Sequence, residues 1–139
     1  MKDTFTQIII QIVFAVKNRE RTIKECYREE LQKYMCGVIR NKNCKPLAIY
    51  CNPDHTHILI GLHPSIALSD LVRDIKSNSG KWLNTKMKTC FRWQKGYSAF
   101  SYNRKELELI TKYIRNQPIH HKKSSFQEEY QSLMESFEI

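Results

Sequence analysis

The chain has 139 residues and a mass of 16.6 kDa, which is the size of one ordinary domain with a real core. Hydrophobic residues make up 41% and charged residues 27%, a balance that excludes a disordered tail and a membrane bundle. The formal net charge of +9 points to a polyanionic partner, with nucleic acid first and an anionic membrane surface second.

The charge is unevenly distributed along the chain. Residues 1–123 carry +13, whereas residues 124–139 hold four Glu and no Lys or Arg and carry −4. The sequence therefore predicts a catalytic or binding body over 1–123 and an acidic C-terminal extension over 124–139 that belongs to the same domain. Apolar spacing over 125–137 predicts a short amphipathic helix there, which we expect to dock on a basic surface.

The cysteines and the hydropathy of the chain indicate the cellular compartment. The five cysteines form no C-x-x-C pair and are odd in number, which argues against a disulfide framework and a zinc knuckle. The apolar run from Ile8 to Val16 is broken by Gln11 and is too short to span a bilayer. It also lacks the features of a secretion signal. We therefore expect a cytoplasmic protein with reduced thiols and no membrane partner.

The first third of the chain predicts a strand and a helix. Residues 6–16 are rich in Ile, Val and Phe, which is typical of a buried strand. Thr22 and Glu25 have the spacing of a capping box, and the apolar positions that follow mark one face of a helix to about Ile39.

The middle of the chain predicts a hairpin and a second helix. Residues 46–51 and 55–62 read as strands, and the short Asn52-Pro53-Asp54 turn between them favours antiparallel pairing. A helix is expected from about Ser69, with its apolar residues facing the core and its basic residues facing solvent.

A fourth strand and a third helix follow. Residues 93–102 predict the strand, with Gly96 inside it as the sign of a bulge or a close backbone approach. Asn103 and Glu106 again have capping spacing and open a helix that runs to the region of Pro118.

The expected order is β-α-β-β-α-β-α followed by a tail. This is the split β-α-β arrangement of ferredoxin-like and RNA-recognition-like folds, an α+β class with one antiparallel sheet and helices on one face. Because such folds host many functions, the function must be argued from particular residues.

A histidine pair lies inside the third predicted strand. Since side chains alternate across a strand, His55 and His57 project from the same face and can reach one ion. For an isolated H-x-H, two histidines on a solvated face is the better interpretation. A zinc site comes second, because zinc requires further N or S ligands and no Cys lies nearby in sequence.

A tyrosine and a glutamine lie four residues apart on the third predicted helix. Tyr113 and Gln117 therefore share a face, at the border of its buried stripe. Alone, Tyr113 is the ordinary helix-edge tyrosine with a packed ring and a wet hydroxyl. Together with His55 and His57, the set can hold a divalent cation and place a phenol to attack a phosphate bound to it.

Four stretches then carry a resemblance that covers nearly the whole chain. They are I-V-F-A-V-K-N-R (12–19), P-D-H-T-H-I-L-I-G (53–61), W-Q-K-G-Y-S-A-F-S (93–101) and Y-I-R-N-Q-P-I-H-H-K-K (113–123). In this order and spacing, the chain resembles the single-tyrosine transposases of the HUH superfamily, which are encoded by small bacterial insertion sequences.

The resemblance implies a site and a reaction. His55, His57 and Gln117 would be the ligands of Mg²⁺ or Mn²⁺, and Tyr113 would be the nucleophile. Such enzymes cleave single-stranded DNA through a 5′-phosphotyrosine and rejoin it by attack of a 3′-hydroxyl. They recognise hairpins near the element ends and act as homodimers, in which the tyrosine helix of one protomer can complete the histidine site of the other.

One departure and two alternatives remain. Between the histidines the family has a bulky hydrophobe, whereas this chain has Thr56, whose hydroxyl needs a partner on the opposite sheet face. One alternative function is a non-catalytic or domesticated hairpin-binding module on the same fold. The other is an enzyme that nicks without rejoining, as replication initiators do.

Further residues are candidates for DNA contact. A basic run spans the second helix and the loop after it: Arg73, Lys76, Lys81, Lys86, Lys88 and Arg92. Such a run is usually a solvated face, and the charge of the body favours DNA binding here. The aromatic side chains of the fourth strand can stack on bases, although core packing is the more ordinary role for most of them: Trp93, Tyr97, Phe100 and Tyr102. His63, His120 and His121 are left out of the metal site.

Overall fold

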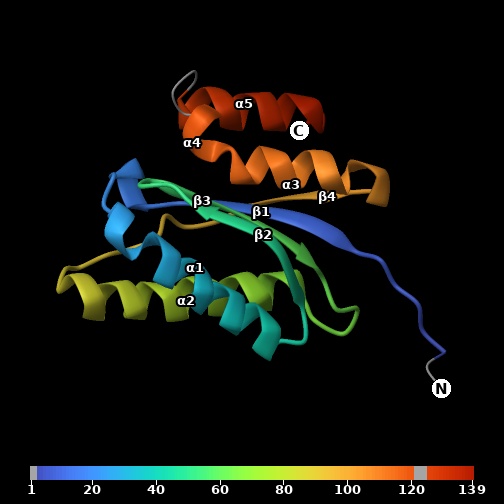
Figure 1. Cartoon of the computed structure of the whole chain (residues 1–139), viewed down its shortest axis with the longest axis horizontal. Helices are drawn as coiled ribbons and strands as arrows, with labels where there is room; N and C mark the ends of the chain where they lie inside the picture. The colour runs from blue at the N-terminus through green and yellow to red at the C-terminus, as the bar shows by residue number, and fades with distance from the viewer. Residues whose placement is uncertain (1–2, 121–124) are drawn as a thin grey trace.

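The computed structural model describes residues 3–120 and 125–139. Its centre is a four-stranded antiparallel sheet in the order β2-β3-β1-β4, with helices packed on it (Figure 1). The strands are β1 Ile9–Ala15, β2 Lys45–Cys51, β3 His55–Gly61 and β4 Ser98–Tyr102. The main helices are α1 Glu25–Asn41, α2 Leu68–Met87, α3 Leu107–Arg115, α4 Gln117–His120 and α5 Phe126–Ser136. The expected α+β class and antiparallel sheet are confirmed.

Helices cover both faces of this sheet. α1 and α2 lie on one face, and α3, α4 and α5 lie on the other (Figure 1). The expectation that the helices share a single face therefore holds for the first two and is wrong for the rest. The physical reason is that the central strands are apolar on both sides: Ile12 and Ile58 pack toward α1 and α2, while Leu59 packs with Ile110 and Ile114 of α3.

The register between β1 and β3 determines where the two histidines lie in the sheet. β1 pairs with β3 so that Ala15 lies opposite His55 and Val13 lies opposite His57. The predicted β2–β3 hairpin forms, with residues 52–54 as its turn. Both histidines therefore lie near the turn, at the end of the sheet where β1 finishes.

One of the two predicted capping boxes forms. Asn103 Oδ1 accepts from Glu106 N at 3.1 Å and Glu106 Oε1 accepts from Asn103 N at 3.0 Å, at the start of a 3-10 turn that leads into α3. The box predicted at Thr22 is wrong, because α1 begins at Glu25 after an uncapped Lys24. Ile23 N donates to Pro53 O at 3.0 Å instead, which holds this segment against the hairpin turn.

Two further boundaries differ from expectation. β4 is shorter than the predicted 93–102, because Gly96 has a φ of +84° and only Trp93 forms an isolated bridge to Val16 before the strand begins. The third helix also breaks at Asn116, so Tyr113 lies on α3 and Gln117 opens α4.

No helix among the described residues is long and apolar enough to cross a bilayer. All five cysteines are free thiols, as expected.

Candidate active site

The two strand histidines are buried on the face covered by α3, α4 and α5. His55 and His57 project from β3 to the same side, and both are 0% exposed, with their ring centroids 5.1 Å apart. The interpretation of solvated strand histidines is therefore wrong, since a helix layer covers this face.

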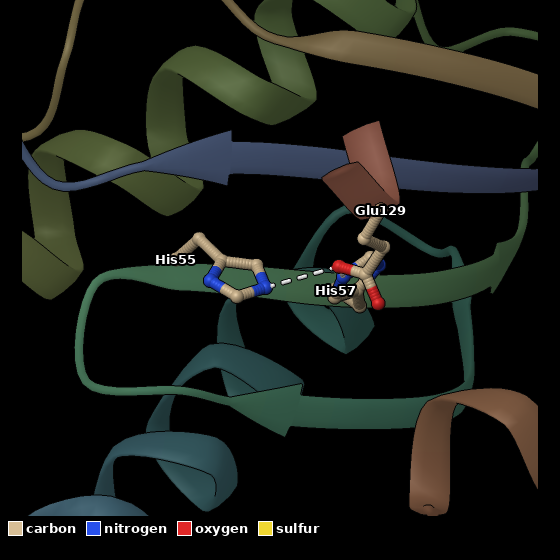
Figure 2. Close-up of side chains that lie close together, drawn as sticks. All are labelled: His55, His57 and Glu129. Atoms are coloured by element: carbon tan, nitrogen blue, oxygen red, sulfur yellow. Dashed lines mark hydrogen bonds and ion pairs between the residues drawn. The ribbon is translucent and has the colours of Figure 1, made fainter. Parts of the chain in front are cut away.

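A glutamate from the C-terminal helix lies between the two imidazoles (Figure 2). Glu129 Oε1 is 2.9 Å from His57 Nε2 and 3.3 Å from His55 Nε2. Phe126, one turn earlier on α5, stacks on the His55 ring with centroids 3.8 Å apart. α5 thus docks with its acid in the site. Its packing partners on the sheet are apolar and include Val13 and Phe100, not the basic surface that was expected.

The predicted nucleophile and third ligand converge on the same carboxylate. The Tyr113 hydroxyl donates to Glu129 Oε2, and Gln117 Nε2 donates to the same oxygen at 3.0 Å. The Tyr113 ring lies edge-on to His57 with centroids 5.8 Å apart. The structure therefore brings together all four residues proposed from the sequence, although α3 ends between Tyr113 and Gln117.

Neighbouring side chains orient this arrangement. Asp54 Oδ1 lies 2.7 Å from His55 Nδ1, which directs His55 Nε2 toward the centre of the site. Asn52 Nδ2 donates to Gln117 Oε1 at 3.1 Å and lies 3.2 Å from His55 Nε2. The hairpin turn thus holds both a histidine and the glutamine of α4.

The buried polar groups shift each other's ionisation. Burial lowers the pKa of His55, but hydrogen bonds to Asp54 and Glu129 outweigh it, and the pKa is raised overall. Burial alone would raise the pKa of Glu129, yet hydrogen bonds to His55 and His57 hold it far below its usual range. The pKa of Tyr113 is raised well above its usual value by burial and by its hydrogen bond to the Glu129 carboxylate.

These donors fit a divalent metal ion. His55, His57 and Glu129 offer ligand atoms that all lie within 4.8 Å of one another. Metal–ligand bonds of about 2.1 Å at right angles place neighbouring donors about 3.0 Å apart. The two N···O separations, 2.9 and 3.3 Å, are close to that spacing. Imidazole nitrogen suits softer ions, whereas carboxylate oxygen suits Mg²⁺ and Mn²⁺. The mixed donor set therefore fits a divalent cation but does not select one particular metal.

The sequence argument missed Glu129. Its signal was present, because position 129 is three residues after Phe126 and four before Leu133, both on the apolar side of α5. An acid inside an apolar helical stripe needs a buried partner. Here the partners are the histidines of β3, more than seventy residues earlier.

Most of the predicted DNA-contacting residues lie on α2, away from this site. Arg73 pairs with Asp70 and Asp74 on α2, on the sheet face opposite the histidines. Lys76 Nζ donates to Gln94 O at 2.6 Å and to Gly96 O at 2.8 Å, which gives it a structural role. The other four are exposed, in a sequence that runs along α2 into the loop after it: Lys81, Lys86, Lys88 and Arg92. Their contact with DNA stays a prediction.

The remaining candidates lie apart from the metal donors. The His63 side chain pairs with Ser65 Oγ at 2.7 Å, beyond the end of β3. The backbone of His120 belongs to α4, and His121 lies outside the described residues. Phe100 is buried and Trp93 packs against Phe14, which confirms a core role for these two aromatic residues.

Comparison with solved structures supports the fold. A crystal structure from Deinococcus radiodurans R1, described as a candidate transposase, superimposes with a TM-score of 0.69 at 18% identity, covering 84% of this chain and 95% of that one. A REP-associated tyrosine transposase bound to a REP hairpin gives a TM-score of 0.65 at 18% identity, covering 87% of this chain and 73% of that one.

Comparison of sequences identifies the family. No curated protein is similar enough in sequence to count as a match. The profile of the family described as "Transposase IS200 like" matches residues 4–117, which include the histidine pair, the tyrosine and the glutamine. α5 and its glutamate lie beyond the matched range. The chain belongs to the IS200-like transposase family.

Proposed function

We propose that this transposase cleaves and rejoins single-stranded DNA by transesterification, with Tyr113 as the nucleophile. One observation carries the proposal: Tyr113, His55, His57 and Gln117 all contact a single carboxylate, that of Glu129. A carboxylate resembles a phosphate in charge and in its hydrogen-bonding oxygens. The space that this carboxylate occupies can therefore take a scissile phosphate beside Tyr113, next to an ion on the histidines and Gln117.

The reaction exchanges one phosphodiester for another without water. The Tyr113 oxygen forms a bond to phosphorus, the bond to the 3′-oxygen breaks, and the phenol proton passes to solvent as the free 3′-hydroxyl takes one up. In rejoining, a 3′-hydroxyl attacks the phosphotyrosine and the tyrosine oxygen leaves. Because no phosphoester is lost, the strand can be resealed without an external energy source.

His55, His57 and Gln117 would hold the divalent ion, Mg²⁺ or Mn²⁺, beside the phosphate. When bound, such an ion neutralises developing negative charge on the phosphate oxygens. Asp54 keeps the Nε2 atom of His55 directed at that position, and Asn52 holds the Gln117 amide. These residues align the phosphate with the Tyr113 oxygen.

The substrate must displace α5 to reach this site. The side chains of His55, His57 and Gln117 are 0% exposed, and Glu129 lies where the phosphate would bind. The structure is therefore the closed arrangement of the proposed enzyme.

Because the REP-associated tyrosine transposase is bound to a REP hairpin, we extend hairpin binding to this chain. The homodimer also stays part of the proposal, although one chain alone brings its own tyrosine beside its own histidines.

A second candidate function is a hairpin-binding module that does not cut. The observation in its favour is the same carboxylate: a site filled by its own glutamate under a helix is inert until that helix moves. The two functions differ in one product, a covalent bond between protein and DNA.

The test uses labelled single strands from both ends of the DNA that flanks the gene. Each strand is incubated with the full chain and Mg²⁺ or Mn²⁺ and run on a denaturing gel. We expect a slow protein–DNA band that disappears in Tyr113→Phe, which removes only the nucleophilic oxygen. Tyr34→Phe, on α1 at the opposite sheet face, is the matched control and should retain the band.

Hairpin binding by Tyr113→Phe should remain within a few-fold of the unaltered chain. A band of unchanged intensity in Tyr113→Phe would remove this residue from the mechanism. Binding without any covalent band, for the unaltered chain with both metals, would favour the non-catalytic module.

A further inference from the structure

Gln11 is a polar residue in the middle of the apolar strand β1. It is 0% exposed, and its neighbours Ile12 and Val13 are core residues. A buried amide in such a strand is costly unless its donors and acceptor are satisfied. The family motifs quoted above begin at Ile12 and give Gln11 no role.

The Gln11 side chain links the site to a second tyrosine. Its amide nitrogen lies 2.8 Å from His57 Nδ1, and its oxygen accepts from the Tyr102 hydroxyl at 2.6 Å. The other nitrogen of His57, Nε2, lies 2.9 Å from Glu129 Oε1. A continuous chain of hydrogen bonds thus runs from Tyr102 through Gln11 and His57 to Glu129.

With the Gln11 amide in this orientation, the hydrogen bonds assign the proton of a neutral His57 to one ring nitrogen. A neutral imidazole has one N–H and one lone pair. With the Gln11 amide N–H donated to Nδ1, the lone pair is on Nδ1 and the proton is on Nε2, where it points at Glu129. A metal ion needs the lone pair on Nε2, so His57 must first move its proton to Nδ1, where that proton requires an acceptor.

Gln11 can supply that acceptor by turning its terminal amide over. The oxygen then faces Nδ1–H, and the amide nitrogen faces the Tyr102 oxygen, which can accept as well as donate. At Nδ1, His55 needs no such change, since the Asp54 carboxylate beside that nitrogen only accepts when ionised. The two metal-site histidines thus differ in the group that faces Nδ1: an amide that can donate or accept for His57, and a carboxylate that only accepts for His55.

We propose that Gln11 is a positioning residue that sets the tautomer of His57, in one amide orientation for the closed site and in the other for the metal-bound site. The proposal rests on His57 being a metal ligand, as in the proposed function. The tautomer can be measured without metal, so failure of the Gln11 proposal can be told apart from failure of the proposed metal site.

The first measurement is the tautomer of His57 in the metal-free chain, by long-range ¹H–¹⁵N NMR. We expect the proton on Nε2 in the unaltered protein and a proton on Nδ1 in Q11E, whose carboxylate offers only acceptors. The same spectrum in both proteins would overturn the proposal. Q7E, an exposed glutamine just before β1, is the matched control and should leave the His57 signals unchanged.

The second measurement is Mn²⁺ affinity by calorimetry on the full chain. Q11L removes the hydrogen bonds at similar size and should weaken binding about 10- to 100-fold, whereas Q11E should bind at least as tightly as the unaltered chain. A merely structural role would instead weaken both variants in proportion to their loss of melting temperature, which would overturn the proposal. If H57A binds Mn²⁺ as well as the unaltered chain, the proposed metal site fails, whatever the tautomer result.

Discussion

At the scale of single residues, Glu129 decides the state of the site. Its carboxylate contacts two buried imidazoles, a phenol and an amide, so the charge of a largely buried acid is balanced within the protein. Removing one partner of such a set leaves the others buried and unpaired, which is more costly than the set itself is stabilising. The closed site is therefore held as a unit.

Thr56, between the two histidines, is predicted to cost stability. Its hydroxyl is buried and makes no hydrogen bond of normal geometry among the described residues. The neighbouring Cys51 thiol interacts with it only weakly, because sulfur is a poor donor and acceptor. Burial raises the pKa of that thiol to about 12, so it stays neutral and offers Thr56 no charge. We expect Thr56→Val to raise the free energy of unfolding by about 1 kcal/mol, because Val keeps the shape and removes the unsatisfied group.

Urea denaturation at neutral pH measures this change. Thr85→Val is the matched control, since the Thr85 hydroxyl is on the exposed side of α2 and donates to Lys81 O at 3.0 Å. It should leave stability unchanged or slightly lower. A Thr56→Val protein that is less stable than the unaltered chain would show that the hydroxyl has a partner in solution.

At the scale of elements, α5 is the cover of the site. Ser125 caps its first turn, with the side chain accepting from Glu128 N at 3.2 Å. Its apolar side packs on Val13 of β1 and Phe100 of β4. This apolar contact holds Glu129 in place, so in the proposed mechanism the stability of α5 on the sheet sets how often the site is open.

Weakening that contact should speed the reaction with DNA. Leu133, on the packed side of α5, contributes roughly 2 kcal/mol of docking if its burial is lost. Leu133→Asp should therefore raise the open population, and the initial rate of covalent complex formation, by up to about 30-fold. Gln131→Asp adds the same charge on the exposed side and should leave the rate unchanged.

Hydrogen exchange of the α5 amides shows whether the helix has been released. If exchange in Leu133→Asp accelerates while the rate of covalent complex formation stays the same or falls, α5 is part of the productive site and not its cover.

The same elements show how far the sequence predicts this molecule. Strand alternation was sufficient to place His55 and His57 on one face, and i,i+4 spacing was sufficient to bring Gln117 near Tyr113 even though the helix breaks between them. Both relations are local. Glu129 was missed because its partners are long-range, and the capping box at Thr22 failed because a backbone bond from Ile23 to the hairpin turn competes with it.

At the scale of the whole molecule, a group of exposed basic residues lies beside the candidate active site, at one end of the sheet. A groove there is lined by exposed basic residues from the segment after β1 and from the loop before β4: Lys17, Arg21, Lys24 and Arg92. Val16 N donates to Asp54 O at 2.8 Å, and Arg19 lies over the ring of Phe126, the residue that stacks on His55. The groove therefore adjoins the hairpin turn that holds the site.

This arrangement predicts where the DNA backbone lies. We expect the triple change Lys17→Gln, Arg21→Gln and Lys24→Gln to weaken binding of a hairpin with a single-stranded flank. Each phosphate that the protein no longer neutralises should lower the slope of log affinity against log salt by about 0.7 for a single strand, so the three changes together should lower it by about 2. Fluorescence anisotropy over a salt titration measures both quantities.

A second triple removes the same charge at exposed residues that do not line the groove: Lys33→Gln, Lys105→Gln and Lys112→Gln. If net charge alone attracts DNA, both triples will lower the affinity and the slope equally. If the groove binds the backbone, only the first will lower the slope. A larger loss from neutralising the exposed basic residues of α2 would place the backbone on the opposite sheet face, so a bound strand would have to pass around the sheet edge to reach Tyr113.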